Sequence, residues 1–347
     1  MPRPPIRGAV RTLFAILTVA VLAACGKGTP ITSGTPTPAP TPPPSVTAQY
    51  PVPTASSKPI GIALGSDGNL WFTEFAASKI GQLAHNGTIS ENVTPSAKAE
   101  PNGIASGSGP NLNVWFTETA LGQVGQITTG GPPYTEYSLP VAGTHPVGIT
   151  LGADGNMWIT DVGTNSIWRI KQTHARPFVK FTQFALTGNA QPTAIVNGPD
   201  GALWFTEPGT SHIGRLPISG SPLTEYPIRA NSMPAGIAAG TDNAIWFVEA
   251  KSKMLGRMAL TGSVTAEYPL TGAISPDAVI QGIDGNFYFT DSGANKIGQF
   301  FVRSHQVKYY SIPTASSEPT AMTLGIDNFI YFTETAGNKI GQFRYFI

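Results

Sequence analysis

The sequence lacks a second cysteine, because Cys25 is the only thiol among its 347 residues. No intrachain disulfide can form, and no set of cysteine ligands can hold a metal ion. The stability of the folded chain must therefore come from packing and hydrogen bonding.

Charge is also scarce. Charged residues make up 12% of the chain, and the formal net charge is +1. Proteins that bind nucleic acids carry an excess of basic residues to neutralise phosphates, and this chain has no such excess. The sequence therefore predicts no nucleic-acid partner. The 39 glycines and 32 prolines instead indicate many turns and short strands.

Long apolar runs are missing except near the N-terminus. Residues 13–24 form a run that is too short for a stable membrane span, and three arginines precede it. This pattern predicts a secretion signal at 1–24. The signal ends in Leu-Ala-Ala-Cys-Gly, which resembles the lipobox of bacterial lipoproteins, where cleavage before the cysteine is coupled to acylation of its thiol. Lipidation of Cys25 is therefore predicted, with an uncleaved helix and an incidental cysteine as the alternative.

Residues 25–48 are mostly Pro, Thr, Ser and Gly. Such a segment cannot pack a core, and its prolines favour an extended tether. A folded domain at 49–347 would then be held away from a membrane surface. We expect an exported, membrane-anchored lipoprotein of the periplasm or cell surface.

A repeat occupies the rest of the chain. In each unit a proline is followed three residues later by Ile, Val or Met, and successive prolines are 42 to 46 residues apart. The seven prolines are Pro59, Pro101, Pro146, Pro192, Pro234, Pro276 and Pro319. Repeats of this length are typical of solenoids, propellers and arrays.

One unit shows what the repeat builds. A short apolar run at 62–64 ends in an Asp-Gly turn, an aromatic and β-branched run follows at 70–73, and a third run follows at 80–83. No stretch has helical spacing over more than a few residues. Four antiparallel strands repeated seven times predict an all-β, seven-bladed β-propeller over 49–347.

The seventh unit ends after its third strand. Residues 49–53 match the missing fourth strand and precede the first complete unit. We therefore expect this segment to pair with residues 340–345, so that both ends of the domain share one blade. Closure removes the open sheet edges through which copies could associate, and a monomer is expected.

An acid ends the second strand of every unit. These acids are Glu74, Glu118, Asp161, Glu207, Glu249, Asp291 and Glu334. A residue type present in all seven units serves blade geometry more readily than one asymmetric site. We expect each carboxylate to accept backbone N–H bonds. The third strand carries a glycine in six units but Trp168 in the third, which we expect to perturb packing locally.

Function is expected where the units differ, on the face that carries the connection into each first strand. The residues around the repeated prolines form a varied ring there, and such concave surfaces bind ligands. The predicted ligand-binding residues are Asn102, His145, Thr193, His212 and Thr320. Either histidine is a candidate base or metal ligand, with a plain polar surface role as the alternative. A small molecule, a peptide or a partner in the cell envelope is expected to bind there.

Three phrases carry a family resemblance: Asp-Gly-Ala-Leu-Trp-Phe-Thr-Glu at 200–207, Thr-Glu-Tyr-Pro at 224–227 and Asn-Lys-Ile-Gly-Gln at 295–299. They resemble the virginiamycin B lyase (streptogramin B lyase) family, and the resemblance covers roughly residues 50–347. It implies a seven-bladed propeller. It also implies an activity that opens a cyclic depsipeptide by elimination, in which a base removes a Cα proton while an ester C–O bond breaks, with assistance from Mg²⁺.

The residues depart from the family's catalytic pattern, which has Pro-His-x-Ile in the last two blades and a Glu before the second proline. Here the positions of the two histidines are held by Asp277 and Thr320, although Glu318 matches. An unperturbed Asp is a far poorer base than His at neutral pH, and Thr is none. Two hypotheses follow: ligand binding without catalysis, which we favour, or a rearranged lyase with Asp277 as base and Glu318 and Glu334 holding Mg²⁺.

Overall fold

A computed structural model describes residues 43–108, 113–172 and 179–345. The predicted signal at 1–24, the lipidation site Cys25 and most of the predicted tether lie outside these residues. In the part of the chain that is described, no helix is long and apolar enough to cross a membrane.

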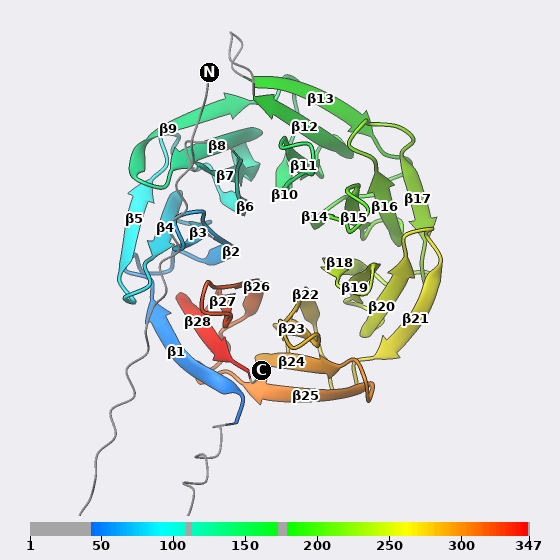
Figure 1. The fold of residues 1–347 in the computed structure, drawn as a ribbon. Coiled ribbons are helices and arrows are strands. Elements are labelled where there is room, and N and C mark those ends of the chain that lie inside the picture. The colour runs from blue at the N-terminus through cyan, green and yellow to red at the C-terminus, as the bar shows by residue number, and fades with distance from the viewer. Residues whose placement is uncertain (1–42, 109–112, 173–178, 346–347) are drawn as a thin grey trace, which may run out of the picture. The chain divides into compact units, whose positions relative to one another are not determined.

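Seven four-stranded antiparallel sheets form a ring, which confirms the predicted seven-bladed propeller (Figure 1). We number the blades by their first strands. They are blade one, β2 (Pro59–Leu64), β3 (Leu70–Glu74), β4 (Lys79–Leu83) and β5 (Ile89–Val93); blade two, β6 (Pro101–Ser106), β7 (Asn113–Glu118), β8 (Gln123–Thr128) and β9 (Gly131–Ser138); blade three, β10 (Pro146–Leu151), β11 (Met157–Asp161), β12 (Ser166–Gln172) and β13 (Val179–Ala185); blade four, β14 (Ile195–Asn197), β15 (Leu203–Glu207), β16 (His212–Leu216) and β17 (Thr224–Pro227); blade five, β18 (Pro234–Gly240), β19 (Ala244–Glu249), β20 (Met254–Ala259) and β21 (Val264–Pro269); blade six, β22 (Pro276–Gln281), β23 (Phe287–Asp291), β24 (Lys296–Phe301) and β25 (Gln306–Ser311); and blade seven, β26 (Pro319–Leu324), β27 (Ile330–Glu334), β28 (Lys339–Arg344) and β1 (Ser45–Pro51).

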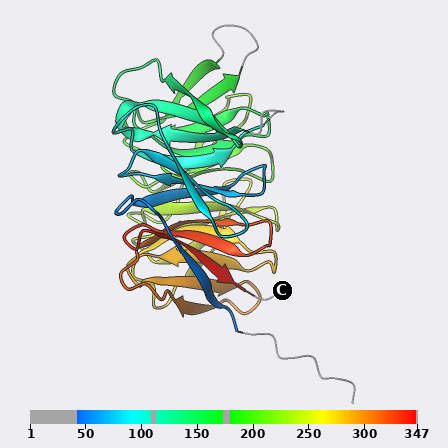
Figure 2. The same ribbon diagram turned by 90° about the vertical axis from the view of Figure 1, so that its left-hand side faces the viewer.

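The first strand of each blade lies nearest the axis, and the fourth lies at the outer edge (Figure 1). Seen from the side, the strands run across the thickness of the ring, and successive blades lie beside one another (Figure 2). Apart from a single 3₁₀ turn at Thr119–Leu121, the described residues outside the strands are turns and connections.

Blade seven joins the two ends of the domain. The strand β1 pairs antiparallel with β28, from Ser45 opposite Arg344 to Pro51 opposite Lys339. It begins four residues before the expected domain boundary at 49. Because β1 is the fourth strand of its blade, the innermost strand of blade one, β2, follows it directly along the chain.

An asparagine fixes the connection from blade seven to blade one. The Asn338 side chain accepts a bond from the Ser57 N–H at 2.8 Å, and its amide donates to the carbonyls of Val52 and Thr54. The Asn295 side chain makes the same kind of contacts with the connection between blades six and seven, reaching the Ser317 N–H and the Thr314 carbonyl. The closing junction therefore uses the same hydrogen bonds as a junction inside the chain.

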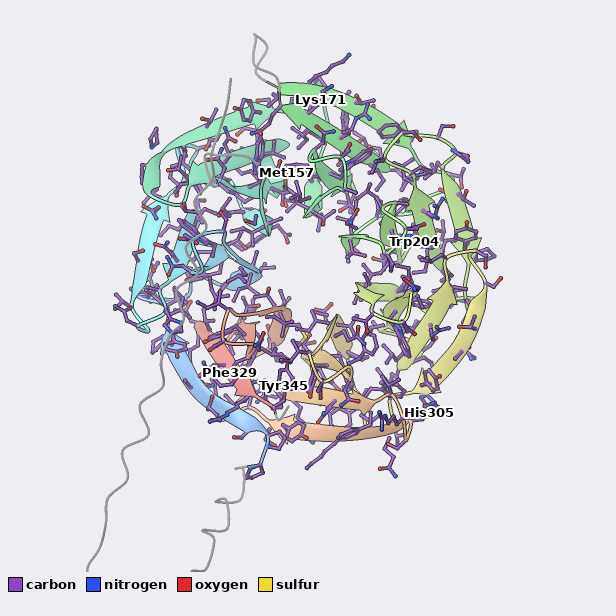
Figure 3. All side chains as sticks on the ribbon, viewed as in Figure 1. Met157, Lys171, Trp204, His305, Phe329 and Tyr345 are labelled. Carbon is purple, nitrogen blue, oxygen red and sulfur yellow. The ribbon has the colours of Figure 1, made fainter. Side chains whose placement is uncertain are left out.

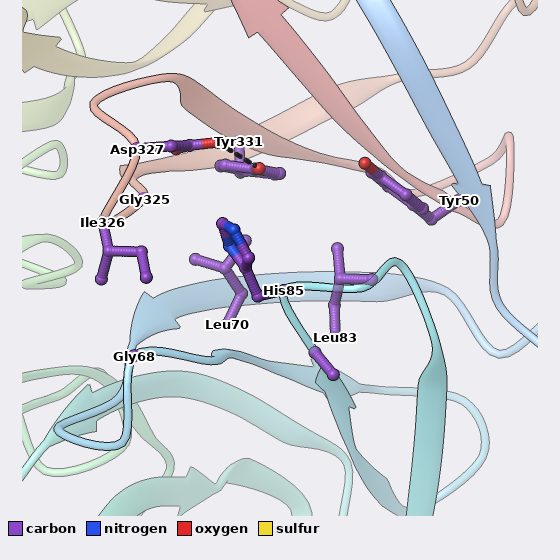
Figure 4. Close-up of a pocket in the computed structure, with 10 residues that line it drawn as sticks. Tyr50, Gly68, Leu70, Leu83, His85, Gly325, Ile326, Asp327 and Tyr331 are labelled. Carbon is purple, nitrogen blue, oxygen red and sulfur yellow. Dashed lines mark hydrogen bonds between the residues drawn. The ribbon is translucent and has the colours of Figure 1, made fainter.

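Apolar side chains fill the same junction on the opposite face of the ring. Tyr50 of β1 lies beside Leu83 of blade one and Tyr331 of blade seven, whose hydroxyl donates to Asp327 at 2.8 Å (Figure 4). The cavity left there is about 20 Å³, enough for little more than one water molecule.

The core lies between and within the blades, and aromatic residues of the second strands dominate it. Figure 3 shows Trp204 and Met157 within the body of the ring, while Lys171 and His305 lie at its outer edge. Trp204 is fully buried, and Met157 is almost fully buried. Without disulfides among the described strands, this packing is the main source of stability.

The recurring third-strand glycine is explained by the phenylalanine opposite it. Phe72 pairs with Gly81, and a Cβ added to that glycine would lie 2.1 Å from the ring. In blade three both members are exchanged, because Ile159 stands opposite Trp168. The tryptophan fills the space that phenylalanine fills elsewhere and is 2% exposed. The expected local perturbation is not seen in the strand pairing, because β11 and β12 pair without a register shift and the Trp168 indole N–H donates to Asp161 at 3.1 Å.

Trp168→Gly should destabilise the domain by about 4 kcal/mol, because it leaves a cavity opposite Ile159. Adding Ile159→Phe recreates the pair present in six blades and should recover part of this loss. Urea unfolding of the two variants measures the difference. Equal stability of the single and double variants would show that these two residues do not compensate each other.

Candidate functional site

A cavity of about 510 Å³ lies on the axis of the ring. Its wall is built from three successive residues of each innermost segment, beginning directly after the repeated proline. The first of these layers consists of Ile60, Asn102, Val147, Thr193, Ala235, Asp277 and Thr320. The second layer contains only glycine and alanine, and the third is Ile, Val or Met. The wall is therefore mostly aliphatic.

Small second-layer residues are required because neighbouring innermost strands approach closely. A Cβ on Gly61 would lie 2.3 Å from the carbonyl oxygen of Asn102 in the next blade. The Thr73 hydroxyl bridges the same junction, since it accepts from the Gly61 N–H and donates to the Asn102 carbonyl at 2.7 Å. This hydrogen-bonded arrangement ties the backbones of neighbouring innermost strands together. The side chains of the first layer remain free to line the channel.

The hydroxyl bridge between neighbouring blades recurs at five of the seven junctions. The donors are Thr73, Thr117, Thr160, Thr290 and Thr333. The two junctions that flank blade five lack it among the described residues. Blade five itself has Val248 in place of the threonine, and Thr206 of blade four bonds within its own blade. The wall therefore has fewer hydroxyl restraints around blade five, although the strands there remain closely packed, since a Cβ on Gly236 would lie 2.4 Å from the Asp277 carbonyl oxygen.

The predicted ligand-binding residues separate into two groups. Asn102, Thr193 and Thr320 line the cavity. The two histidines lie outside its lining. His145 is exposed, with Nδ1 3.1 Å from the Gly143 carbonyl, and His212 is half-buried at the start of β16, with Nδ1 2.9 Å from the Thr210 carbonyl.

The three acids proposed for chemistry lie in different environments. Asp277 lines the cavity, and desolvation raises the pKa of its carboxyl to about 6. Glu318 is exposed, on a left-handed backbone with φ of 51°. Glu334 is fully buried inside blade seven, where Oε1 accepts from the Gln49 amide at 2.7 Å while Oε2 has no partner.

This donor set does not fit Mg²⁺. The ion needs several oxygen ligands in octahedral geometry. Among the described residues, no group of three or more His, Cys, Asp or Glu side chains is arranged to hold a metal ion. One oxygen of Glu334 is already engaged by an amide donor, and Glu318 faces solvent.

The recurring acids behave in two ways. The aspartates act as predicted: Asp161 accepts the backbone N–H of His145 at 2.7 Å, and Asp291 accepts that of Ser275 at 2.9 Å. The glutamates do not. Both oxygens of Glu118 are buried without a hydrogen-bond donor, and the neighbouring polar group is the carboxyl of Glu136 on β9. A hydrogen bond between two carboxyls forms only when one of them carries a proton.

In four blades the recurring glutamate lies near a second, outer glutamate on the fourth strand, whose charge acts on it. The pairs are Glu74 with Glu91, Glu118 with Glu136, Glu207 with Glu225, and Glu249 with Glu267. Desolvation, followed by the charge of the outer glutamate, raises the pKa of the inner one to about 8 for Glu118 and about 7 for the other three.

The outer glutamates position the rim of the cavity. Glu136 accepts from the backbone N–H and the hydroxyl of Ser96, which lies in the connection that enters the same blade. Glu91 holds Thr54 in the equivalent connection of blade one. The buried acids are therefore part of the support for the loops around the channel mouth, behind the wall and not in it.

Similarity to known proteins agrees with this architecture. The family model described as the virginiamycin B lyase family matches residues 44–176 and 174–345. The chain belongs to the virginiamycin B lyase family. This confirms the resemblance that the repeated phrases indicated.

Solved members of the family have the same fold. A structure described as a streptogramin B lyase is 32% identical, with a TM-score of 0.78, and the match covers 86% of this chain and 96% of that one. A catalytically inactive histidine-to-alanine variant of the Staphylococcus aureus virginiamycin B lyase, crystallised with quinupristin, is also 32% identical, with a TM-score of 0.79 and coverage of 86% and 99%. The Nocardia farcinica virginiamycin B lyase is 36% identical over 53 residues, which span 15% of this chain and only 19% of that relative.

Three further residues of the cavity lining were not among the predicted ligand-binding residues. Pro208, Met233 and Ala250 extend it over blades four and five. Pro208 and Ala250 each directly follow a recurring acid. In most other units the residue at this position is polar or larger, so a small apolar residue there could have indicated the additional apolar lining.

The glutamate pairs predict how stability depends on pH. Their folded-state pKa values lie above the unfolded value of 4.5, so the folded chain binds more protons between these values. The stability that these glutamates contribute should be fully present below about pH 4.5. It should be lost as the pH rises through about 7 to 8. We expect the melting temperature to fall by on the order of 10 °C between about pH 5.5 and about pH 8.5.

Glu118→Gln should flatten this dependence, because the amide donates to Glu136 without needing a proton. It should raise the melting temperature at the higher pH and leave it nearly unchanged at the lower one. Glu318→Gln, which removes an exposed carboxylate, is the matched control. A melting temperature of wild type that rises with pH over this window would contradict the proposed pairing.

Proposed function

We propose that the propeller binds a small molecule or peptide at the channel mouth, without the catalysis of its family. The observation that carries this proposal is the lining of the 510 Å³ cavity, which is aliphatic apart from four polar side chains. Ligand sites of proteins have this volume and this composition, with a few polar groups that fix orientation. Neighbouring blades hold the backbone of the wall with hydroxyl bridges, so the site is largely preformed.

The residues at the catalytic positions support the absence of catalysis. In the Staphylococcus aureus relative, a single histidine-to-alanine variant is described as catalytically inactive. By the resemblance to the family pattern, this chain has Asp277 and Thr320 where histidines are expected. Since the Thr320 hydroxyl is not a base at neutral pH, one of the two positions offers no proton acceptor.

A lyase remains the second candidate, because one observation favours it. The pKa of Asp277 is raised to about 6 by desolvation, which makes its carboxylate a better base than an exposed aspartate. In this alternative Asp277 removes the Cα proton of a cyclic depsipeptide, and the electron pair expels the ester oxygen as the C–O bond breaks. No step is assigned to Mg²⁺, because the acids do not fit the ion.

We further propose that the protein is exported and lipid-anchored. The support is the sequence alone: the arginines and apolar run at 1–24 and the lipobox-like phrase around Cys25. Expression in a bacterial host with an alkyne-tagged fatty acid should label the wild type and not Cys25→Ala. Equal labelling of both would contradict lipidation at this thiol.

Binding at the channel mouth is tested with Nile red, an uncharged apolar dye whose fluorescence rises in apolar surroundings. We expect saturable fluorescence with the full-length chain and its loss in Ala235→Trp, because the indole would occupy the first layer of the wall. Ala238→Ser, on the same strand but outside the cavity lining, is the matched control. Equal dye binding in wild type and Ala235→Trp would exclude the channel as the site.

Catalysis is tested in the same preparation. Quinupristin incubated with the full-length chain and Mg²⁺ should remain cyclic by mass spectrometry. Ring opening that is lost in both Asp277→Asn and Glu318→Ala would favour the lyase instead.

A further inference from the structure

Of the four polar side chains on the wall, two are already satisfied. The Thr193 hydroxyl lies 3.0 Å from that of Thr206, and the Thr320 hydroxyl lies 2.7 Å from that of Thr335. Both partners belong to the same blade as the threonine they contact. The carboxylate of Asp277 and the amide of Asn102 have no hydrogen-bond partner among the described residues. These two groups are therefore available to a ligand.

Asp277 is the one ionisable group in the lining of the cavity. It lies on β22, between Ala235 of blade five and Thr320 of blade seven in the first layer. None of the ion pairs among the described residues involves it. A carboxylate in an apolar wall has lost part of its hydration, and a cation that contacts it would restore favourable electrostatics.

An apolar extension of the cavity lies on one side of this carboxylate. Beyond the three wall layers, the lining continues over blades four and five through Pro208, Met233, Pro234 and Ala250, and Ile280 of blade six adds one further apolar residue. Met233 is 48% exposed, and it adjoins other apolar residues of the cavity lining, so it adds to a contiguous apolar surface. We call the four residues over blades four and five the apolar ledge. Blade five, which supplies three of them, is next to the blade of Asp277.

The cation that fits is organic and not a metal ion. A hard metal ion needs several oxygen ligands, whereas the cavity offers one carboxylate with both wall threonines already engaged. An ammonium group needs only one carboxylate and a few acceptors. An apolar body attached to it would bury surface against the ledge and the aliphatic wall.

We propose that the channel mouth binds an organic ammonium ion with an apolar body, its nitrogen against Asp277 and its body over the apolar ledge. This inference rests on the proposed channel binding and names the chemical class of its ligand. Asn102 stands on β6, across the channel from β22 (Figure 1), where it can hydrogen-bond a distal polar group of a longer ligand.

The charge state of the site agrees with this assignment. Desolvation raises the pKa of Asp277 to about 6, so the carboxylate is mostly ionised at about pH 7.5. A bound cation favours the ionised form further.

The test compares 4-phenylbutylammonium with 4-phenylbutan-1-ol, which has the same apolar body without the charge. In calorimetric titrations of the full-length chain at about pH 7.5, the ammonium should bind at least about tenfold more tightly than the alcohol. Asp277→Asn should remove this preference and leave alcohol binding unchanged. Glu100→Gln is the matched control, because it removes one carboxylate from the same face but outside the cavity lining, and it should keep the preference.

The other possible outcomes distinguish failure of the ammonium assignment from failure of channel binding. Equal affinity of wild type for the two probes would overturn the ammonium assignment while leaving channel binding intact, provided that Ala235→Trp blocks both. A preference that survives Asp277→Asn but is lost in Glu100→Gln would place the cation on the rim, and so would also overturn it. If neither probe nor Nile red binds, the proposed function and the inference fail together.

Discussion

The pairing of β1 with β28 is the contact on which the channel depends. Every other blade is made from one continuous segment, whereas blade seven is assembled from the two ends of the domain. If this pairing were lost, the fourth strand of blade seven would be missing and β28 would present an unpaired edge. The innermost strands β2 and β26 would still be linked by the Thr333 hydroxyl, which donates to the Ile60 carbonyl, but the outer edge of their junction would be open. Strand pairing at the outer edge of one blade thus completes the ring around the cavity.

The repeat made the fold predictable because each of the seven units independently shows the sequence pattern of the same four-stranded blade. The turn, the buried aromatic strand and the third-strand glycine recur at matching positions, so seven weak local signals agree. Trp168 shows the limit of this reasoning. Within its own strand, Trp168 is only an exception to the recurring glycine. The cross-strand register, which places Trp168 opposite Ile159, is needed to explain how the tryptophan fits. Register between strands is a property of pairs, which a repeat pattern alone does not give.

The candidate site was predictable in position and less so in detail. The varied residues after the repeated prolines lie in the cavity wall, and Asn102, Thr193, Asp277 and Thr320 all line it. The two histidines were chosen for their chemistry, but strand direction and loop path decide which side chains reach the axis. The buried glutamates were missed for a related reason. Their partners are on the fourth strand, 17 or 18 residues further along the chain, so sequence proximity does not reveal the pairing.

Blade five brings these features together. It lacks the threonine bridge at both of its junctions, and it supplies most of the apolar ledge beside Asp277. A junction without the bridge has fewer restraints on the relative position of two innermost strands. Such a junction can adjust to a ligand at lower cost than the bridged ones, while the remaining five hold the rest of the wall. The family fold thus provides a rigid ring in which one sector combines an unpaired carboxylate, exposed apolar surface and local freedom. These properties set the proposed ligand site apart from the structural positions that are repeated around the ring.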